Sequence, residues 1–302
     1  MEDTTSLLAS VHLGKKSEGS TAYDPSLIVP IPRRLNRSQY QIEDNALPFC
    51  GFDVWHAYEF SALTENGVPV TRLLKIQYPA NSECIVESKS LKLYLNSFNM
   101  TGIGKTTSEC LSESKKRIER DLSERLKGDV KVNFLKEDSK TERLFVSYES
   151  LMDRVNEEKL HFSSYKEAPE VLKTEDGRGR KSYFLRYDSL RSNCRVTHQP
   201  DFGDVFIYYS SEKHITEESL LEYLVSFRGE YHFHEECVEM IWKRLEDILS
   251  EGDELMVTAM YTRRGGIDIN PVRYSPNTDS GVIDSLEALK DLTVKAFSSI
   301  KQ

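Results

Sequence analysis

Residues 90–98 read SLKLYLNSF, and residues 219–227 read SLLEYLVSF. The two segments carry the same residue at six of nine positions, and each precedes a helical pattern, a Gly-Asp pair and a strand pattern. Chance similarity between short segments rich in Leu, Tyr and Ser is the alternative, but the ordered features that follow favour a duplication. The repeat therefore predicts an α+β fold of two similar modules, each an antiparallel sheet with helices packed on one face.

The elements around the first copy have clear periodic patterns. Residues 52–78 predict two strands joined by a tight turn at Glu65-Asn66-Gly67, because Asn-Gly accepts the positive φ of such turns. Residues 108–127 predict a helix, and 130–134 alternate like a half-buried strand. The helix carries one apolar stripe, formed by Leu111, Ile118, Leu122 and Leu126. After the second copy, 238–249 predict a helix and 255–259 a strand.

The length of 302 residues fits about two domains of roughly 150 residues. The proline-marked residues 1–45 predict an irregular lead-in, whose basic run at 33–37 usually means a solvated surface. We place the N-terminal module at 46–150, a linker region at 151–181 and the C-terminal module at 182–302. The end of the linker, 174–181, is predicted to be an exposed loop.

Composition excludes several classes of protein. Lys and Arg total 40 against 49 Asp and Glu, a net charge of −9, which argues against a bulk nucleic-acid binder. The start of the chain lacks a signal-peptide pattern, and no stretch reaches the ~18 apolar residues of a membrane span. The cysteines are odd in number and form no CxxC pair: Cys50, Cys84, Cys110, Cys194 and Cys237. We therefore expect a soluble, cytoplasmic protein with free thiols.

Two motifs suggest chemistry that the rest of the sequence does not support. Residues 99–106, NMTGIGKT, end like a phosphate-binding loop, but Asn99 replaces its first glycine, so a glycine-rich turn before a helix is the better interpretation. Residues 232–237, HFHEEC, have metal-ligand spacing. Because no second Cys/His cluster completes a four-ligand site, structural histidines are the better interpretation there.

Two further segments have alternatives that spacing alone leaves open. In residues 191–201, RSNCRVTHQPD, Arg191 and Arg195 would favour a reactive thiolate at Cys194, and Asp201 is a nearby acid. A buried, inert cysteine is the alternative. In residues 262–266, TRRGG, backbone and guanidinium groups can approach an anion together, or the segment is a solvated turn. There is no GxGxxG, so a dinucleotide would not bind in Rossmann fashion.

Taken together, the segments resemble one family, the NADPH-dependent 7-cyano-7-deazaguanine reductases, which are the nitrile reductases of queuosine biosynthesis. The resemblance rests on VESKSLKLYLNSFN (86–99), SNC with its following Asp201, SFR and FHEECV (226–238), and YTRRGGIDINP (261–271). The lead-in resembles the long, two-module branch. Residues 140–190 match least, and Gly229-Glu230 depart from the family pattern.

The resemblance implies tandem tunnelling-fold modules, usually assembled as a homodimer. The first module would carry the Glu-Lys motif, Glu87-Ser88-Lys89, and the second would carry the reactive Cys194. Cys194 would add to the nitrile carbon as a thiolate and form a thioimide, and Asp201 would protonate the nitrogen. Two NADPH would then reduce the adduct to 7-aminomethyl-7-deazaguanine without a metal. The resemblance requires no direct contact with nucleic acid or a membrane.

The same resemblance implies the binding residues. Glu235 would hold the purine-like base through two hydrogen bonds. His234 would line the nitrile side of the substrate together with Val86, Glu87 and Ser88. The residues that would contact NADPH are Ser88, Lys89, Arg264 and Gly265.

Two other functions compete with this one. A zinc-dependent cyclohydrolase of the same fold class would use Cys194, His234 and Cys237 as ligands, although a second ligand cluster is missing. A non-catalytic module would bind a purine or tRNA without turnover.

Overall fold

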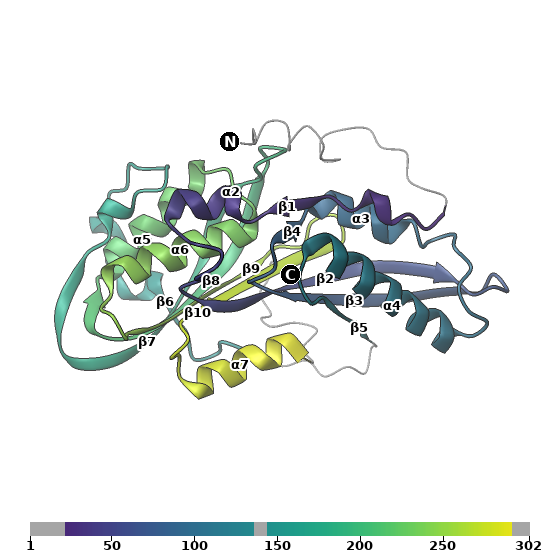
Figure 1. Cartoon of the computed structure of the whole chain (residues 1–302). Helices are drawn as coiled ribbons and strands as arrows, with labels where there is room; N and C mark the ends of the chain where they lie inside the picture. Colours follow the sequence, from purple (N-terminus) through teal and green to yellow (C-terminus); the bar gives the residue numbers. More distant parts are fainter. Residues whose placement is uncertain (1–21, 136–143, 292–302) are drawn as a thin grey trace. The chain divides into compact units, whose positions relative to one another are not determined.

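A computed structural model describes residues 22–135 and 144–291. These residues form two compact units (Figure 1). The first unit contains residues 22–45, 52–135 and 263–269, and the second contains 46–51, 144–262 and 270–291. The bounds differ from those drawn on the sequence, chiefly because residues 263–269 join the first unit from far along the chain.

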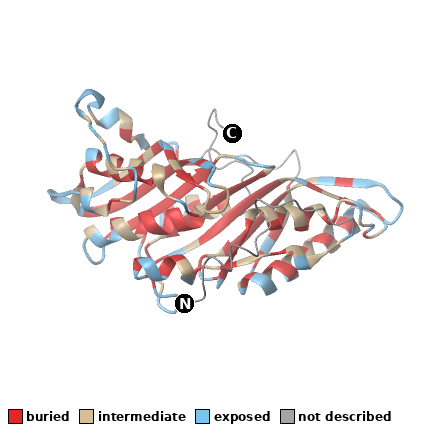
Figure 2. Ribbon diagram, turned by 90° about the horizontal axis from the view of Figure 1, so that it is seen from above, coloured by how far each residue is buried: buried red, intermediate tan, exposed pale blue. Residues whose placement is uncertain are grey.

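The sheet of the first unit is antiparallel. Strands β2 (Cys50–Leu63), β3 (Pro69–Pro79) and β5 (Lys131–Leu135) follow the order β5-β3-β2, and the first residues of β10 (Ile267–Tyr274) belong to the same unit. The turn between β2 and β3 has Gly67 at φ 79°, which confirms the predicted hairpin. Figure 2 shows its tip exposed and the strands largely buried.

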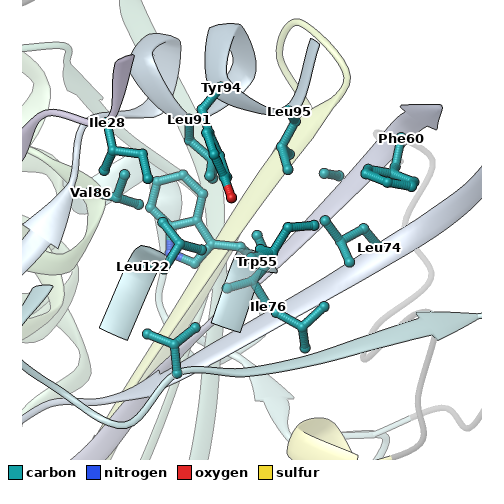
Figure 3. Close-up of a cluster of buried hydrophobic side chains, with 14 of the residues drawn as sticks. Ile28, Trp55, Phe60, Leu74, Ile76, Val86, Leu91, Tyr94, Leu95 and Leu122 are labelled. Carbon is teal, nitrogen blue, oxygen red and sulfur yellow. The ribbon is translucent and has the colours of Figure 1, made fainter. Parts of the chain in front are cut away.

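Helices α3 (Ser88–Asn96) and α4 (Thr107–Leu126) cover one face of this sheet (Figure 1). The predicted stripe of α4 is confirmed, since Ile118, Leu122 and Leu126 are fully buried. Figure 3 shows Trp55, Leu74 and Ile76 of the strands facing Leu91, Tyr94 and Leu122 of the helices. Each such side chain contributes about 1.5–3 kcal/mol on burial. Packing against the sheet therefore fixes where α3 and its first turn lie.

The turn before α4 confirms the interpretation of residues 99–106. Gly104 has φ 63°, and a Cβ there would lie 2.7 Å from the Cβ of Glu109, so only glycine fits. The Thr106 side chain accepts the N–H of Glu109 and caps the helix. The segment is a turn and helix cap, not a phosphate-binding loop.

The lead-in is more ordered than its sequence predicts. It contains η1 (Pro25–Leu27), β1 (Pro30–Pro32), α2 (Arg34–Arg37) and η2 (Ser38–Tyr40), and β1 pairs with β4 (Cys84–Val86). The expectation of a solvated basic run is wrong for two residues. Arg33 is buried against Asp53, and Arg37 is buried where it donates to the carbonyl of Ala80. Buried partners thus compensate the charges.

The second unit has a longer sheet. Strands β7 (Thr174–Asn193), β8 (Pro200–Ile215), β9 (Glu254–Tyr261) and the rest of β10 are antiparallel neighbours, and β6 (Glu149–Ser150) runs parallel to β7. Helices α5 (Glu217–Ser226) and α6 (His234–Ile248) cover one face, while α7 (Ser280–Asp291) lies on the other side in Figure 1. The short 3₁₀ helices are η3 (Leu151–Arg154), η4 (Glu157–Lys159), η5 (Pro169–Val171) and η6 (Phe227–Gly229).

The predicted loop at 174–181 is wrong. These residues belong to β7, where Thr174 pairs with Ile215, although the register is irregular between Asp176 and Lys181. Their side chains are exposed, so the segment lacks the apolar alternation that predicts a strand. Backbone pairing with β8 makes it a strand.

The α+β class, with antiparallel sheets and helices on one face of each, is confirmed. Among the described residues, none of the helices is both long enough and apolar enough to cross a membrane.

Candidate active site

Cys194 lies on the tight connection between β7 and β8. Its N–H donates to the carbonyl of Gln199 at 2.8 Å, and its own carbonyl accepts the N–H of His198 at 3.0 Å. His198 adopts a left-handed conformation, with φ 57°, which lets the chain reverse. The thiol is free and Cys194 is half-buried. The predicted nucleophile is therefore held by a hydrogen-bonded turn and keeps access to solvent.

Asp201 and His234 meet close to this turn. Asp201 is buried and pairs across the sheet with Ser192, two residues before the cysteine. Nε2 of His234 lies 3.4 Å from Oδ2 of Asp201. Its other ring nitrogen is buried and has no hydrogen-bond partner within the described residues. An imidazole beside a carboxylate can hold and transfer a proton.

Sequence patterns did not predict the aromatic ring that stacks on His234. Tyr261, at the end of β9, stacks on the imidazole with 3.8 Å between ring centroids and 7° between planes. Tyr261 is almost fully buried, and burial raises its pKa well above the ordinary value. The phenol therefore stays neutral and acts as a packing surface. Strand spacing alone could not show which ring faces the histidine.

Glu235 stands in the first turn of α6, next to His234, and is only 2% exposed. A carboxylate is favoured at a helix N-terminus, where backbone N–H groups point outward. The turn is stabilised by Glu236, whose Oε2 accepts the N–H of Phe233 at 2.9 Å. The second unit thus places Asp201 beside His234, with Cys194 on the turn before β8 and Glu235 next to His234 in the first turn of α6.

The zinc interpretation finds no ligand set here. Cys237 is fully buried, its Sγ donates to Oγ of Ser192 at 3.6 Å, and burial raises its pKa to about 12. His232 contacts Glu230 and Glu236. Across residues 22–135 and 144–291, no three His, Cys, Asp or Glu side chains are arranged to hold a metal ion.

The two arginines flanking Cys194 make structural contacts. Arg191 donates to the carbonyl of Arg228 at 2.8 Å and to Oδ1 of Asn193 at 3.1 Å. Arg195 forms an ion pair of 3.1 Å with Glu236. Both guanidinium groups, predicted to favour a thiolate, fasten the turn to the segment before α6.

Glu87, in the first unit, is completely buried and caps α3. One carboxylate oxygen accepts the N–H of Lys89 at 2.9 Å, and the other accepts the N–H of Ser90 at 2.7 Å. Its neighbour Val86 is buried at the end of β4, and Ser88 begins the helix. The Glu-Lys motif was predicted as a binding motif, but its capping role was missed.

The predicted cofactor residues gather in the first unit. Arg264 and Ile267 exchange two backbone hydrogen bonds, of 2.8 and 3.0 Å, across Gly265 and Gly266. Both glycines have positive φ, 57° and 81°, as a two-residue type I′ turn requires. Lys92 of α3, the helix that carries Ser88 and Lys89, donates to the carbonyl of Gly265. The turn and the helix therefore lie side by side.

A shallow depression lies between them, lined partly by Glu59, Phe60, Lys92 and Asn96. The turn has a second support on β2. Tyr58 donates its N–H to the carbonyl of Gly266 at 2.9 Å and its hydroxyl to Asp268 at 2.7 Å. These contacts join residues about two hundred positions apart, so no local pattern predicts them.

Family models match both parts of the chain. One described as "Nitrile reductase, 7-cyano-7-deazaguanine-reductase N-term" matches residues 20–134, and one described as "QueF-like protein" matches residues 200–280. Curated relatives from Cupriavidus metallidurans and Cupriavidus necator are each 42% identical, over 268 and 270 residues. Each alignment covers 88% of this chain and 93% of the relative, and both relatives are named NADPH-dependent 7-cyano-7-deazaguanine reductase.

This chain belongs to the 7-cyano-7-deazaguanine reductase family. The resemblance seen in the sequence is thereby confirmed, together with the fold class that it implied. The Glu-Lys motif lies within the first matched region, and Asp201, His234 and Glu235 lie within the second. Cys194 falls between the two regions, so its assignment depends on the motif and on the geometry of its turn.

Proposed function

We propose that this enzyme reduces the nitrile of 7-cyano-7-deazaguanine to an aminomethyl group at the expense of two NADPH. One observation carries the proposal. A free, half-buried thiol stands on the turn between β7 and β8, and the buried Asp201 carboxylate at the start of β8 lies 3.4 Å from the His234 imidazole, in a chain of the 7-cyano-7-deazaguanine reductase family. A nucleophile next to a proton donor is what addition to a nitrile needs.

In the first step, the Cys194 thiolate adds to the nitrile carbon and forms a C–S bond. The electron pair of the broken π bond goes to nitrogen, which takes a proton from Asp201. The product is a covalent thioimide, a better hydride acceptor than the nitrile. His234 lies beside Asp201 and would return a proton to it from solvent.

Two hydride transfers complete the reaction. The first NADPH delivers a hydride to the thioimide carbon, and the C–S bond then breaks to release the thiolate and leave an imine. The second NADPH delivers a hydride to the imine carbon, and nitrogen takes another proton. In total, the nitrile consumes two NADPH and two protons and yields the amine and two NADP⁺.

The proposed binding residues are those that the family motifs imply. We propose that Glu235 binds the purine-like base of the substrate, because its carboxylate can accept two hydrogen bonds. His234 would contact the nitrile side of the substrate. Val86, Glu87 and Ser88 are the proposed substrate contacts in the first unit. Ser88, Lys89, Arg264 and Gly265 are the proposed cofactor contacts, supported by the contact between Lys92 and Gly265.

We also propose a cytoplasmic homodimer that requires neither a metal nor direct contact with nucleic acid. The five cysteines are all free, as in a reducing compartment, and the net charge of −9 disfavours a polyanion. Sedimentation equilibrium tests the assembly, for which we expect twice the mass of the chain.

The direct test of the nucleophile is mass spectrometry after incubation with the nitrile in the absence of NADPH. We expect the intact protein to gain the mass of one nitrile, with the adduct mapped to Cys194. Cys194→Ala should gain none. An adduct on another cysteine, or equal labelling of the variant, would contradict the proposal.

A further inference from the structure

Arg195 directly follows the proposed nucleophile, and its guanidinium group is held on three sides. Nη1 lies 3.1 Å from Oε1 of Glu236, Nη2 lies 3.1 Å from Nδ1 of His232, and Nε donates to the carbonyl of Tyr231 at 3.3 Å. The Arg195 and Glu236 side chains are only 13% and 7% exposed. A planar guanidinium with several partners in place has a fixed direction, unlike most surface arginines.

Glu236 connects this contact to α6. Its second oxygen accepts the N–H of Phe233, the residue immediately before the helix, and so satisfies one of the free amides of the first turn. His234 and Glu235 stand in that turn. A single carboxylate therefore binds Arg195 and also shapes the start of the helix that carries two site residues.

Asn193, on the other side of Cys194, contacts the same segment through its backbone. Its N–H donates to the carbonyl of Glu230 at 2.8 Å, and its carbonyl accepts the N–H of His232 at 3.0 Å. Cys194 is thus bracketed by two residues fastened to the segment before α6. Because the Arg195 contact is made by a side chain, it can be removed without changing the strand pairing.

We propose that Arg195 is a positioning residue for nitrile capture. By fastening the turn to the first turn of α6, it holds the Cys194 thiol in place relative to His234 and Glu235. The inference rests on the proposed function. The charge of Arg195 is paired with Glu236, which assigns it a geometric role rather than stabilisation of a thiolate. Displacing a reacting group by about 1 Å can cost ~10²-fold in rate.

The test measures the rate of adduct formation with 7-cyano-7-deazaguanine in the absence of NADPH. We expect Arg195→Ala to slow this step by about tenfold or more. Arg178→Ala is the matched control, because Arg178 is exposed near the far end of β7, and it should react like the wild type. In a Cys194→Ala background, Arg195→Ala should change the dissociation constant of the nitrile by less than about twofold.

A second experiment tests whether Arg195 acts through its contact with Glu236. The double variant Arg195→Ala/Glu236→Gln should be no slower than the slower single variant, because both remove the same link. Multiplicative losses would overturn the proposal, as would an unchanged rate for Arg195→Ala. If the slower adduct formation of Arg195→Ala returns to the wild-type rate at high pH, the role of Arg195 is electrostatic and the proposal is wrong.

If Arg195→Ala does not fold, the same rate is measured with Arg195→Lys. Lysine keeps the charge but cannot reach the three partners together, so we expect intermediate slowing, and a wild-type rate would overturn the proposal. A wild-type protein that forms no adduct would contradict the proposed function instead.

Discussion

At the scale of single residues, two cysteines near the candidate site differ in reactivity. Cys194 is half-buried on its turn, whereas Cys237 is fully buried and its pKa is raised to about 12 by burial. Only a thiolate reacts quickly with alkylating agents, so a buried thiol of high pKa is inert. Cys84, with a pKa raised to about 11 mainly by burial, should behave like Cys237.

We therefore predict that iodoacetamide at about pH 8 modifies Cys194 but spares Cys84 and Cys237 in the folded protein. Peptide mapping by mass spectrometry measures the extent at each site. Substrate nitrile should protect Cys194 and leave the exposed Cys50 unprotected, which serves as the internal control. Modification of Cys237 at the rate of Cys194 would contradict the burial argument.

His232 gives a pH-dependent contribution to stability. Burial lowers its pKa, but the hydrogen bonds to Glu230 and Glu236 outweigh burial and the nearby Arg195, so the pKa is raised above the ordinary value of about 6.5. The folded protein then binds the proton more tightly than the unfolded chain. This stabilisation is complete below the unfolded-state pKa and is lost as the pH rises through the folded-state pKa.

We accordingly expect His232→Gln to destabilise the protein more at about pH 6 than at about pH 8.5. Urea unfolding of the wild type and variant at both pH values measures the difference. His161→Gln is the control, because that histidine is exposed. An equal loss at the two pH values would show that His232 acts by packing alone.

At the scale of elements, the turn at Arg264–Ile267 holds two glycines at positive φ, and a side chain at one of them would displace the carboxylate of Glu59. A Cβ on Gly266 would lie 2.5 Å from Cδ of Glu59, and φ is 81°. A Cβ on Gly265 would meet nothing closer than Lys92 Nζ at 3.7 Å. Both positions carry the strain of positive φ, and the Glu59 carboxylate, at the far end of a flexible and 62% exposed side chain, can move away from a Cβ on Gly266 at little cost.

We predict that Gly265→Ala and Gly266→Ala each raise the KM for NADPH and cost about 1 kcal/mol of backbone strain, with only a small further loss for Gly266→Ala from displacing Glu59. Steady-state kinetics and urea unfolding measure the two effects. Glu59→Ala should recover only this small further part of the Gly266→Ala loss, because it removes the contact and leaves the strain. If the double variant recovered most of the loss, backbone strain would not be the main cause.

Helix α6 is tied to β10 by a buried ion pair. Arg273 donates from Nε and Nη2 to Oε1 of Glu239, at 3.0 and 2.8 Å, and neither side chain is more than 3% exposed. Its guanidinium also lies 5.6 Å from the ring centroid of Phe49. Removing one partner of a buried ion pair is strongly destabilising.

Glu239→Gln should therefore lower the free energy of unfolding by about 3–5 kcal/mol. Chemical denaturation followed by far-UV circular dichroism measures it. Glu246→Gln, on the exposed side of the same helix, is the control and should cost less than about 1 kcal/mol. A small loss for Glu239→Gln would mean that the Arg273 charge has other compensation.

Sequence patterns predicted these elements well where packing is periodic. The apolar stripe of Ile118, Leu122 and Leu126 predicted the bounds of α4 to within one residue at each end. The Asn66-Gly67 pair predicted the hairpin. Residues 174–181 failed because strand pairing there depends on the partner strand and not on their own polarity. Apolar residues alternate along a strand only where one of its faces is buried, so the sequence of an exposed strand carries no such pattern.

At the scale of the whole molecule, the repeat and the family motifs predicted two modules and named candidate site residues. They could not show that residues 263–269 join the first unit, because that depends on where β10 begins in space. Contacts such as Arg195 with Glu236 and Tyr261 with His234 also arise only on folding. Motifs in the sequence therefore supplied candidate residues for the chemistry, and the side chains that contact those candidates became visible only in the fold.

The central claim is a four-electron reduction through Cys194, and its most direct test counts NADPH consumed against amine formed. With 7-cyano-7-deazaguanine and a strong chelator present, we predict two NADPH oxidised per 7-aminomethyl-7-deazaguanine, and no turnover by Cys194→Ala. Another ratio, undiminished turnover by the variant, or a folded wild-type protein that is inert until zinc is added would contradict the account.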